Sequence, residues 1–462
     1  MTERLLAAVR DGKKLTYRQQ LKLVWQLSAP AILAQLSSIL MQYIDASMVG
    51  KLGANDSASI GLVSTTTWLI GGLCASVGTG FTVQIAHRIG AKEEEKARSI
   101  VKHGILGVIL FSAFFAVLGV LIHNKLPVWM GGSPEICANA SKYFLIYAIS
   151  LPALQVVYTA GGMIQCSGNM KLPSIVDIMM CVLDVVFNWI MIFPTRTIHI
   201  AKLSFKMPGL GLGVIGAALG TTAAEVLCGG IMFYYLLVKS PSLHLRKESY
   251  KGNLSEELSK AVRIALPASV ESVIMGFSYV AFTKIVAPLG TIALAAHSFS
   301  ITAESLCYMP GYGIGHAATT IVGQSIGAGR KDITKKLSWF ATGLGIIIMT
   351  LMGVLLYIFA PQMIGLLSPD PAIRELGTTV LRIEAFAEPM YAASIVAAGV
   401  FRGAGKTLTS SVLNLVSVWF VRIPLATFLA PHLGLSGVWM AMCVELIVRG
   451  TLFLIWLKKW KV

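Results

Sequence analysis

Acidic side chains lie inside several long apolar stretches of this sequence. An ionised carboxylate is costly to bury unless a cation or hydrogen-bond donors accompany it, so such residues indicate a binding site until a structural partner is found. Asp45 lies within LMQYIDASMV, and Asp184 lies within CVLDVVFNWIMIF. The candidates for ion and substrate binding are Asp45, Asp184, Asn188, Glu271, Glu304 and Glu388.

Carboxylates in an apolar cleft support two kinds of ion chemistry. Apolar surroundings favour the neutral carboxyl group, which can hold and release a proton near neutral pH. Several oxygens together can instead hold Na⁺, because hard cations prefer oxygen ligands. The same negative cleft attracts an organic cation. Competition between the small ion and the organic cation for one set of charges would couple their movements.

Spacing adds detail around two of these acids. Asp184 and Asn188 are four residues apart, so on a helix they share one face. Met41 and Tyr43 lie beside Asp45, and a thioether and an aromatic ring suit the lining of a cleft that admits cations. We therefore expect Met41 and Tyr43 to line the cleft.

A structural role is the alternative for each acid. Every buried carboxylate could pair with a buried cation or cap a backbone group. The basic residues available inside apolar stretches are Lys284, Arg382, Arg422 and Arg449. The sequence leaves this alternative open for each carboxylate.

The elements that position these residues must be membrane-spanning helices. The chain has 462 residues, of which 55% are hydrophobic and only 13% are charged. Stretches of about 20 apolar residues cross a bilayer as helices, because lipid offers the backbone no hydrogen-bonding partner. We predict an all-α integral membrane protein with twelve such helices, starting near residues 21, 57, 101, 143, 172, 212, 261, 290, 337, 376, 408 and 435.

The distribution of basic residues predicts the orientation. The net charge is +16, and most of the 38 lysines and arginines lie at the two termini and in alternate loops. This bias places both termini in the cytoplasm of a multi-pass protein of the cell membrane, and it accounts for the charge without a nucleic-acid partner. The expected segments are a cytoplasmic N-terminal segment (1–20), an N-lobe (21–238), a cytoplasmic linker (239–260), a C-lobe (261–458) and a cytoplasmic tail (459–462).

The two lobes are copies of one unit. A single constant shift of the sequence against itself places Pro30 on Pro267, Gly53 on Gly290 and Gly168 on Gly405. Each half contains an even number of predicted helices, so the halves are parallel repeats related by a pseudo-two-fold axis along the membrane normal. Two such lobes around a central cleft suit a transporter that works by alternating access.

Two glycine-containing segments resemble nucleotide-binding motifs, and each has another explanation. Gly405-Lys406-Thr407 resembles the end of a phosphate-binding loop, but the spacing of the preceding glycine is wrong, and RGAGKT is the second copy of the turn QCSGNMK. Gly211, Gly213 and Gly216 fit a G-x-G-x-x-G pattern without a preceding strand, so we interpret them as helix-packing residues.

The seven cysteines include no C-x-x-C pair. We expect no cofactor and no metal beyond a transient Na⁺.

Three motifs show a resemblance to a known family. SITAESLCYMPGYGIGHAATTIVGQSIGAGRKD (300–332) closely resembles the eighth helix and following loop of MATE transporters, the multidrug and toxic compound extrusion family. GVFRGAGKT (399–407) is similar to the family's RGAGDT turn, and IDASMVGKLG (44–53) resembles the end of its first helix. The resemblance implies a 6+6 helix layout and export of cationic compounds, driven by inward flow of Na⁺ or H⁺.

The resemblance also bears on single residues. Family members carry a first-helix aspartate, which Asp45 matches, and many carry an Asn followed four residues later by an Asp on helix five. Here the order is reversed, with Asp184 before Asn188. Some members use a helix-seven glutamate eight residues after a proline, whereas Glu271 follows Pro267 by four.

The expected partners are small organic cations and the lipid bilayer, and we expect a monomer.

Two other functions remain as alternatives. A flippase for lipid-linked precursors has a related fold, but its anionic cargo would call for a basic cleft, whereas the excess here is acidic. A membrane enzyme would need a nucleophile–base set or clustered metal ligands, and no motif joins His297 to His316. We therefore expect a carrier and not an enzyme.

Overall fold

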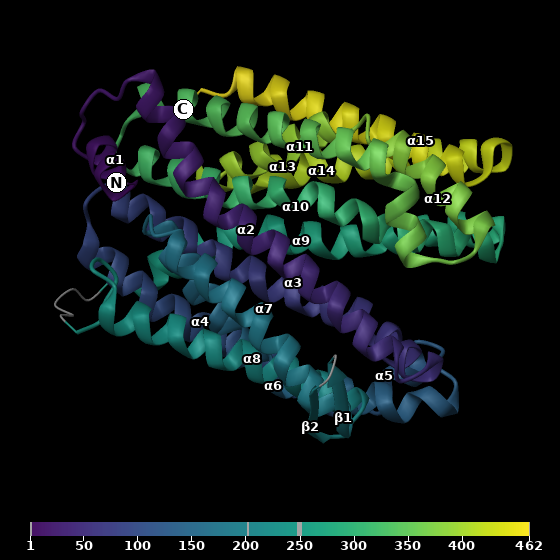
Figure 1. The fold of residues 1–462 in the computed structure, drawn as a ribbon. Helices are drawn as coiled ribbons and strands as arrows, with labels where there is room; N and C mark the ends of the chain where they lie inside the picture. Colours follow the sequence, from purple (N-terminus) through teal and green to yellow (C-terminus); the bar gives the residue numbers. More distant parts are fainter. Residues whose placement is uncertain (1, 201–202, 247–251, 462) are drawn as a thin grey trace.

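The computed structural model describes residues 2–200, 203–246 and 252–461. Nearly all of them are helical (Figure 1). The helices of the N-terminal half are α1 (Thr2–Arg10), α2 (Tyr17–Gly50), α3 (Ala54–Gly90), α4 (Glu94–Ile122), α5 (Leu126–Trp129), α6 (Pro134–Cys166), α7 (Lys171–Ile192) and α8 (Val214–Tyr234), which continues as the π-helix η1 (Tyr235–Lys239).

The C-terminal half contains a corresponding series of helices. Its first long helix begins at Leu254, where the Asn253 side chain accepts a hydrogen bond from the Ser255 N–H. The elements are α9 (Leu254–Val286), η2 (Ala287–Leu289), α10 (Thr291–Gly327), α11 (Lys331–Leu367), α12 (Pro371–Glu384), α13 (Glu388–Gly403), α14 (Thr407–Ser417), η3 (Val418–Arg422) and α15 (Ile423–Lys459). Part of the predicted linker, residues 247–251, lies outside the described residues.

Long apolar helices dominate the structure, as the sequence predicts. Within the described ranges, nine helices are long and apolar enough to cross a membrane, or ten if the bent pair α12–α13 counts as one span. Each predicted start lies within nine residues of an observed helix start, or at the break at Gly434 inside α15. Because Gly434 departs from helical φ and ψ, the stretch from Thr407 to Lys459 contains two straight segments.

The long helices form two groups (Figure 1). In one, α6 packs against α3, α4 and α8, and α7 packs against α8. In the other, α13 packs against α10, α11 and α15. Helix α2 contacts both α7 and α10, so it bridges the two groups. The groups lie close together at the end that carries both chain termini and diverge toward the end that carries α5 and α12 (Figure 1).

Close backbone contacts join the halves near the termini. A Cβ on Gly90 would stand 2.1 Å from the Gln324 backbone oxygen, so only glycine fits there. The Gln324 side chain donates a hydrogen bond to the Cys166 carbonyl at 2.9 Å, and a ring nitrogen of His87 lies 2.8 Å from the Gly403 carbonyl. These contacts fasten the two halves together at this end.

The short helix α1 covers the same junction. Its Leu6 and Val9 are buried in a cluster with residues of both halves, among them Met170 and Ile321. Lys92 donates a hydrogen bond to Asp11 at 2.5 Å, and that bond lowers the pKa of the Asp11 carboxyl. The polar N-terminal segment expected from the sequence is therefore a docked helix.

The all-α prediction is wrong at one place. Two antiparallel strands, β1 (Pro194–Ile200) and β2 (Leu203–Leu210), form a hairpin between α7 and α8. The segment alternates β-branched and aromatic residues with polar ones, which favours a strand. We interpreted it only as a loop, because its strands are short and lie between strongly apolar helices.

The tenth predicted helix is also broken, where the sequence suggested one continuous span. Helix α12 ends at Glu384, α13 begins at Glu388, and the two are bent by 60°. Pro389 lies in the first turn of α13, where its missing N–H costs no helical hydrogen bond. Glu384 and Glu388 therefore flank a break between two helices.

Candidate functional site

Asp45, Asp184 and Asn188 lie together in the N-terminal half. The Asn188 side-chain amide donates to Asp45 Oδ1 at 2.9 Å and to Asp184 Oδ2 at 3.1 Å. The same nitrogen lies 3.3 Å from Thr221 Oγ1 on α8. Asp184 and Asn188 are each only 1% exposed. The structure thus joins α2, α7 and α8 through one amide group.

This cluster contains more oxygen acceptors than donors. Asp184 Oδ1 and Asn188 Oδ1 are buried and have no hydrogen-bond partner among the described residues. A buried acceptor without a donor costs about 1–3 kcal/mol. A proton shared between carboxylates, or a hard cation held by these oxygens, would remove that cost.

Backbone packing fixes the amide at the centre of the cluster. Gly220 on α8 packs so closely on α7 that a Cβ there would lie 2.2 Å from Asn188 Oδ1 and 2.9 Å from Asn188 N. Asp184 and Asn188 lie one helical turn apart on α7, so reversing their order relative to the family pattern keeps both on one face.

Of the two residues predicted to line the cleft, Met41 lines one of the described cavities and Tyr43 does not. Met41 lines a cavity of about 410 Å³ between the halves, together with Ser38 and Gln42. Tyr43 instead donates a hydrogen bond to the Thr302 carbonyl of α10 at 2.5 Å and lines none of the described cavities. Its role is to join α2 to α10.

An aromatic cavity adjoins the cluster. It has a volume of about 450 Å³ and lies among α3, α6 and α8. Its only carboxylate is Glu225, whose Oε1 accepts a hydrogen bond from Tyr158 at 3.3 Å. Thr221 lines this cavity and also contacts Asn188. The rings that line it are Trp68, Tyr143, Tyr147 and Tyr158.

The C-terminal half holds three further buried acids. Glu304 on α10 is 5% exposed, and α10 packs against both α12 and α13, which carry Glu384 and Glu388. All four carboxylate oxygens of Glu384 and Glu388 are buried without a hydrogen-bond partner among the described residues. The predicted Glu304 and Glu388 therefore lie in one group, and the helix break adds Glu384.

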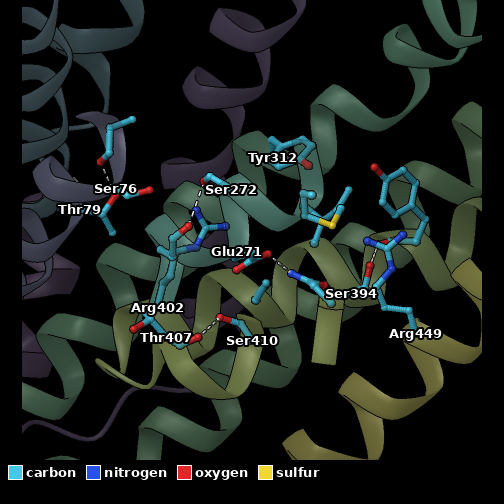
Figure 2. Close-up of a pocket in the computed structure, with 17 residues that line it drawn as sticks. Ser76, Thr79, Glu271, Ser272, Tyr312, Ser394, Arg402, Thr407, Ser410 and Arg449 are labelled. Atoms are coloured by element: carbon cyan, nitrogen blue, oxygen red, sulfur yellow. Dashed lines mark hydrogen bonds between the residues drawn. The ribbon is translucent and has the colours of Figure 1, made fainter. Parts of the chain in front are cut away.

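Glu271 lies apart from those three acids, in a cavity of about 310 Å³ between the halves (Figure 2). One of its oxygens accepts from Ser411 Oγ and the other from Asn414 Nδ2, each at 2.6 Å. Both donors come from α14. The carboxylate is thus held by two short hydrogen bonds.

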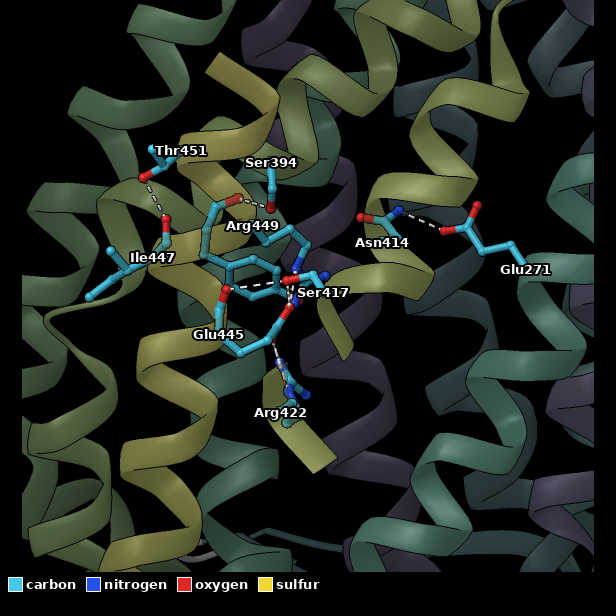
Figure 3. Close-up of polar contacts among 10 residues, drawn as sticks. Glu271, Ser394, Asn414, Ser417, Arg422, Glu445, Ile447, Arg449 and Thr451 are labelled. Carbon is cyan, nitrogen blue, oxygen red and sulfur yellow. Dashed lines mark hydrogen bonds and ion pairs between the residues drawn. The ribbon is translucent and has the colours of Figure 1, made fainter. Parts of the chain in front are cut away.

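The structural alternative applies to Glu445, which is fully buried. Its Oε2 accepts from Arg422 at 2.6 Å and from Arg449 at 3.1 Å, and its Oε1 accepts from Ser417 at 2.6 Å (Figure 3). The π-helical turn η3 ends at Arg422 and presents it to α15. This acid is paired, whereas Glu384 and Glu388 are not. The cluster accounts for Arg422 and Arg449, two of the three arginines that the sequence offered as partners.

Comparison with known proteins identifies the family. The MatE family model matches residues 30–190 and 267–428, one match in each half. The chain belongs to the MatE family. It is therefore a membrane transporter of the multidrug and toxic compound extrusion type, and its two matched segments correspond to the internal repeat.

Relatives and solved structures of this family resemble the transporter over almost its whole length. A probable multidrug resistance protein NorM of Thermotoga maritima is 25% identical over 432 residues, covering 93% of this chain and 90% of the relative. A MATE transporter of Vibrio cholerae, VcmN, has the same fold, with a TM-score of 0.88 at 20% identity over 96% of this chain and 97% of that one. An outward-facing multidrug resistance MATE family transporter gives a TM-score of 0.87 at 20% identity, covering 95% of each chain.

Sequence reasoning missed two charged residues of the transporter that line cavities between the halves. Asp177 lies seven residues before Asp184, two turns away on the same face of α7, and that spacing was the available signal. Arg402 was interpreted only as part of a cytoplasmic turn, yet it lines both cavities between the halves. Among the described residues, no group of three His, Cys, Asp or Glu side chains could hold a metal ion.

Proposed function

We propose that this transporter is a cation-coupled antiporter that exports organic cations. The observation that carries the proposal is the position of Thr221. This residue lines the aromatic cavity and also touches the cluster of Asp45, Asp184 and Asn188. A change at the cluster can therefore reach the cavity wall directly.

The coupling ion, Na⁺ or H⁺, binds at the cluster. Its two carboxylates share one amide donor, and two of its buried oxygens lack a partner among the described residues. Either ion would satisfy these oxygens. Glu304, Glu384 and Glu388 form a second acidic group in the other half, which supports a further ion-binding role there.

The organic cation binds in the aromatic cavity. The faces of Tyr143, Tyr147 and Trp68 attract a positive charge, and Glu225 supplies the opposite charge. A volume of about 450 Å³ suits a drug-sized molecule. The relatives are named as multidrug resistance proteins, which agrees with a cavity that selects charge and aromatic character over detailed shape.

Movement follows from the two-lobe architecture. The two groups of helices are two six-helix lobes, with α10 as one span and the stretch from Thr407 to Lys459 as two spans separated at Gly434. Contacts near the termini hold the cytoplasmic side closed, so this arrangement is the outward-facing one. Alternating access then requires the contacts between His87, Gly403 and Gln324 to separate. The protein acts as a monomer in the cell membrane, with both termini in the cytoplasm.

A flippase for anionic lipid-linked precursors has weaker support. Such a cargo needs an excess of basic groups in the cleft. Of the Lys and Arg side chains that line the cavities between the halves, Arg449 is bound to Glu445, and Arg402 shares its cavity with Glu271. The cavity beside the carboxylate cluster contains a glutamate and no basic side chain.

Ethidium efflux from proteoliposomes tests the proposal. The purified transporter is reconstituted, and a Na⁺ gradient and a pH gradient are imposed in turn. We expect one of the two gradients to drive efflux against the ethidium concentration. Efflux that neither gradient accelerates would contradict the antiporter mechanism.

A further inference from the structure

The first turns of α9 dock on the N-terminal half, whereas the helix as a whole also packs against α14 and α15 of the C-terminal half. Gln84 of α3 donates a hydrogen bond to the Glu257 carbonyl at 3.1 Å. One turn further on, a Cβ on Gly80 would stand 2.5 Å from the Ala261 carbonyl oxygen, so α3 and α9 are in direct backbone contact. The start of α9 therefore joins the two halves at the end that carries both chain termini (Figure 1).

The side chain of Glu257 fastens the same turn of α9 to α4. Its Oε2 lies 2.6 Å from Nδ1 of His103, and its Oε1 accepts a hydrogen bond from Ser99 Oγ at 2.9 Å. Ser99 and His103 are four residues apart, so they share one face of α4. Glu257 is 8% exposed, and a Cβ on Gly252 would collide with both Ser99 Oγ and Glu257 Oε1. The chain that enters α9 thus covers this contact.

Other charged residues surround this contact on three helices. They are Arg88 on α3, Arg98 and Lys102 on α4, and Glu256 and Lys260 on α9. Lys260 donates to Glu256 at 2.5 Å, and Arg88 donates to an acid of its own turn. Among the described residues, Glu257 is the acid that lies within hydrogen-bond distance of His103. A charge on His103 therefore acts first on Glu257.

The internal repeat relates the start of α9 to the start of α2. The offset that takes Pro30 to Pro267 also takes Thr16, the N-cap of α2, to Asn253, the N-cap of α9. The side chain of each cap residue accepts a hydrogen bond from a backbone N–H of its own helix. Helix α2 packs against α11 as α9 packs against α4. The two junctions are copies of one arrangement.

The chemistry of the contact differs between these copies. The same offset pairs Glu257 with Gln20 and His103 with Phe340 of α11. Phe340 packs edge-on against Tyr17, with the ring centroids 4.8 Å apart. The shared architecture therefore does not require a histidine and a carboxylate at this place. Of the two junctions, the one at α9 contains the pair that can respond to pH near neutrality.

Protonation changes the strength of such a contact. Histidine ordinarily exchanges its ring proton at about pH 6.5. A neutral imidazole can donate one hydrogen bond to a carboxylate, whereas an imidazolium adds a positive charge, and charge-assisted hydrogen bonds are roughly twice as strong as neutral ones. The added stabilisation is thus fully present below about pH 6.5 and is lost as the pH rises and the imidazole loses its proton.

We propose that His103 and Glu257 form a pH-dependent latch that docks the start of α9 on the N-terminal half. Protonation of His103 tightens the latch and favours the arrangement in which this end of the transporter is closed. This inference rests on the proposed alternating access, in which the same end must open to the cytoplasm, and it adds control of that opening by the pH on the cytoplasmic side.

Hydrogen exchange of the purified full-length transporter tests the latch. Protection, taken relative to the intrinsic exchange rate at each pH, is compared at about pH 5.5 and about pH 8, on either side of the ordinary histidine range. Residues 254–261 report docking of α9, and residues 84–90 of α3 report closure of the same end. We expect protection of both segments to be about three- to tenfold greater at the lower pH, the effect of strengthening one hydrogen bond by a charge.

Two variants remove the titrating pair. His103→Gln keeps a hydrogen-bond donor for Glu257 but exchanges no proton in this range, so protection should become equal at the two pH values, near the wild-type level at about pH 8. Glu257→Gln keeps the size of the side chain and removes its charge, and it should also remove most of the pH dependence. Agreement between the two variants would not arise from a purely structural role of either residue.

Two further variants serve as matched controls. Ser99→Ala removes a hydrogen bond to the same carboxylate without removing a titrating group. It should lower protection at both pH values and leave their ratio unchanged. Glu256→Gln removes an exposed acid from the same turn and should keep the wild-type ratio.

The outcomes separate the latch from the proposed function. Protection of either segment that is independent of pH in the wild-type protein, or a pH dependence that His103→Gln leaves unchanged, would overturn the latch even if an ion gradient drives ethidium efflux. A pH dependence that both His103→Gln and Glu257→Gln remove would support the latch even if neither gradient drives efflux, and the antiporter mechanism alone would then fail.

Discussion

Gly213 and Gly434 share an unusual backbone conformation. Their φ values are 56° and 58°, and their ψ values are −128° and −141°. Gly213 precedes α8, and Gly434 precedes the last straight segment of α15. The offset that takes Pro30 to Pro267 would carry Gly213 past Gly434, because the β1–β2 hairpin lengthens the N-terminal half ahead of Gly213. Once the hairpin is set aside, the last helix of each half also belongs to the repeat.

Gly434→Ala should destabilise the transporter by about 1–3 kcal/mol, because an L-residue is strained in this conformation. A Cβ at Gly434 would meet nothing within 4 Å, so the loss would come from the backbone alone. Thermal unfolding in detergent measures it. Gly343→Ala in α11 is the control, since a Cβ there also meets nothing and alanine favours a helix. Equal melting temperatures for the two variants would contradict this explanation.

Asp45→Asn should abolish gradient-driven ethidium efflux while the protein still folds. Asparagine keeps the size of the side chain but can neither carry a negative charge nor exchange a proton with solvent. Efflux from proteoliposomes and the melting temperature are measured together. Glu375→Gln, on the exposed part of α12, removes an acid away from the cluster and should retain activity. Full coupled efflux by the Asp45 variant would remove Asp45 from the site.

Gly220→Ala should impair coupling without removing any charge. The added Cβ would lie 2.2 Å from Asn188 Oδ1, so Asn188 must move away from the two aspartates. We expect the dependence of efflux on the ion gradient to weaken at least severalfold. Gly230→Ala on the same helix meets nothing within 4 Å and should behave as the wild type. If the two variants are indistinguishable, the amide is not required at this position.

Leu6→Ala should loosen α1 from the junction of the two halves. Leu6 is 2% exposed, and truncation of a buried leucine costs about 2–5 kcal/mol. Hydrogen exchange of residues 2–10 should become much faster than in the wild type. Arg4→Ala on the exposed face of α1 provides the comparison and should leave exchange unchanged. Unchanged protection in the Leu6 variant would show that α1 does not depend on this contact.

The attachment of the N-terminal segment should also depend on pH. The pKa of Asp11 lies below its ordinary value of 3.8, because Lys92 donates a hydrogen bond to the carboxylate. A lowered pKa means that the stabilisation is present above pH 3.8 and is lost as the pH falls through the lower, folded-state value. Protection of residues 2–11, taken relative to the intrinsic exchange rate at each pH, should therefore decrease below pH 3.8, and Asp11→Asn should remove that change.

Much of the N-terminal cluster could be predicted from the sequence, because its signals are local. Asp184 and Asn188 share one helix face however that helix packs against its neighbours, and Asp45 lies in an apolar stretch. The contact of Asn188 with Thr221 could not be predicted, since it depends on how closely α7 and α8 approach at Gly220. The hairpin was missed because strands of seven and eight residues give a weak signal between apolar helices.

The sequence by itself determined the class of protein, the positions of the apolar helices and the internal repeat, because these depend on composition and on patterns along the chain. The tertiary structure alone decided which acids are paired. Glu445 lies against Arg422 and Arg449, whereas Glu384 and Glu388 lie at a helix break without partners among the described residues. A carboxylate has the same chemistry in every sequence, and only the groups that packing brings within hydrogen-bond distance decide whether it is neutralised or remains available for an ion.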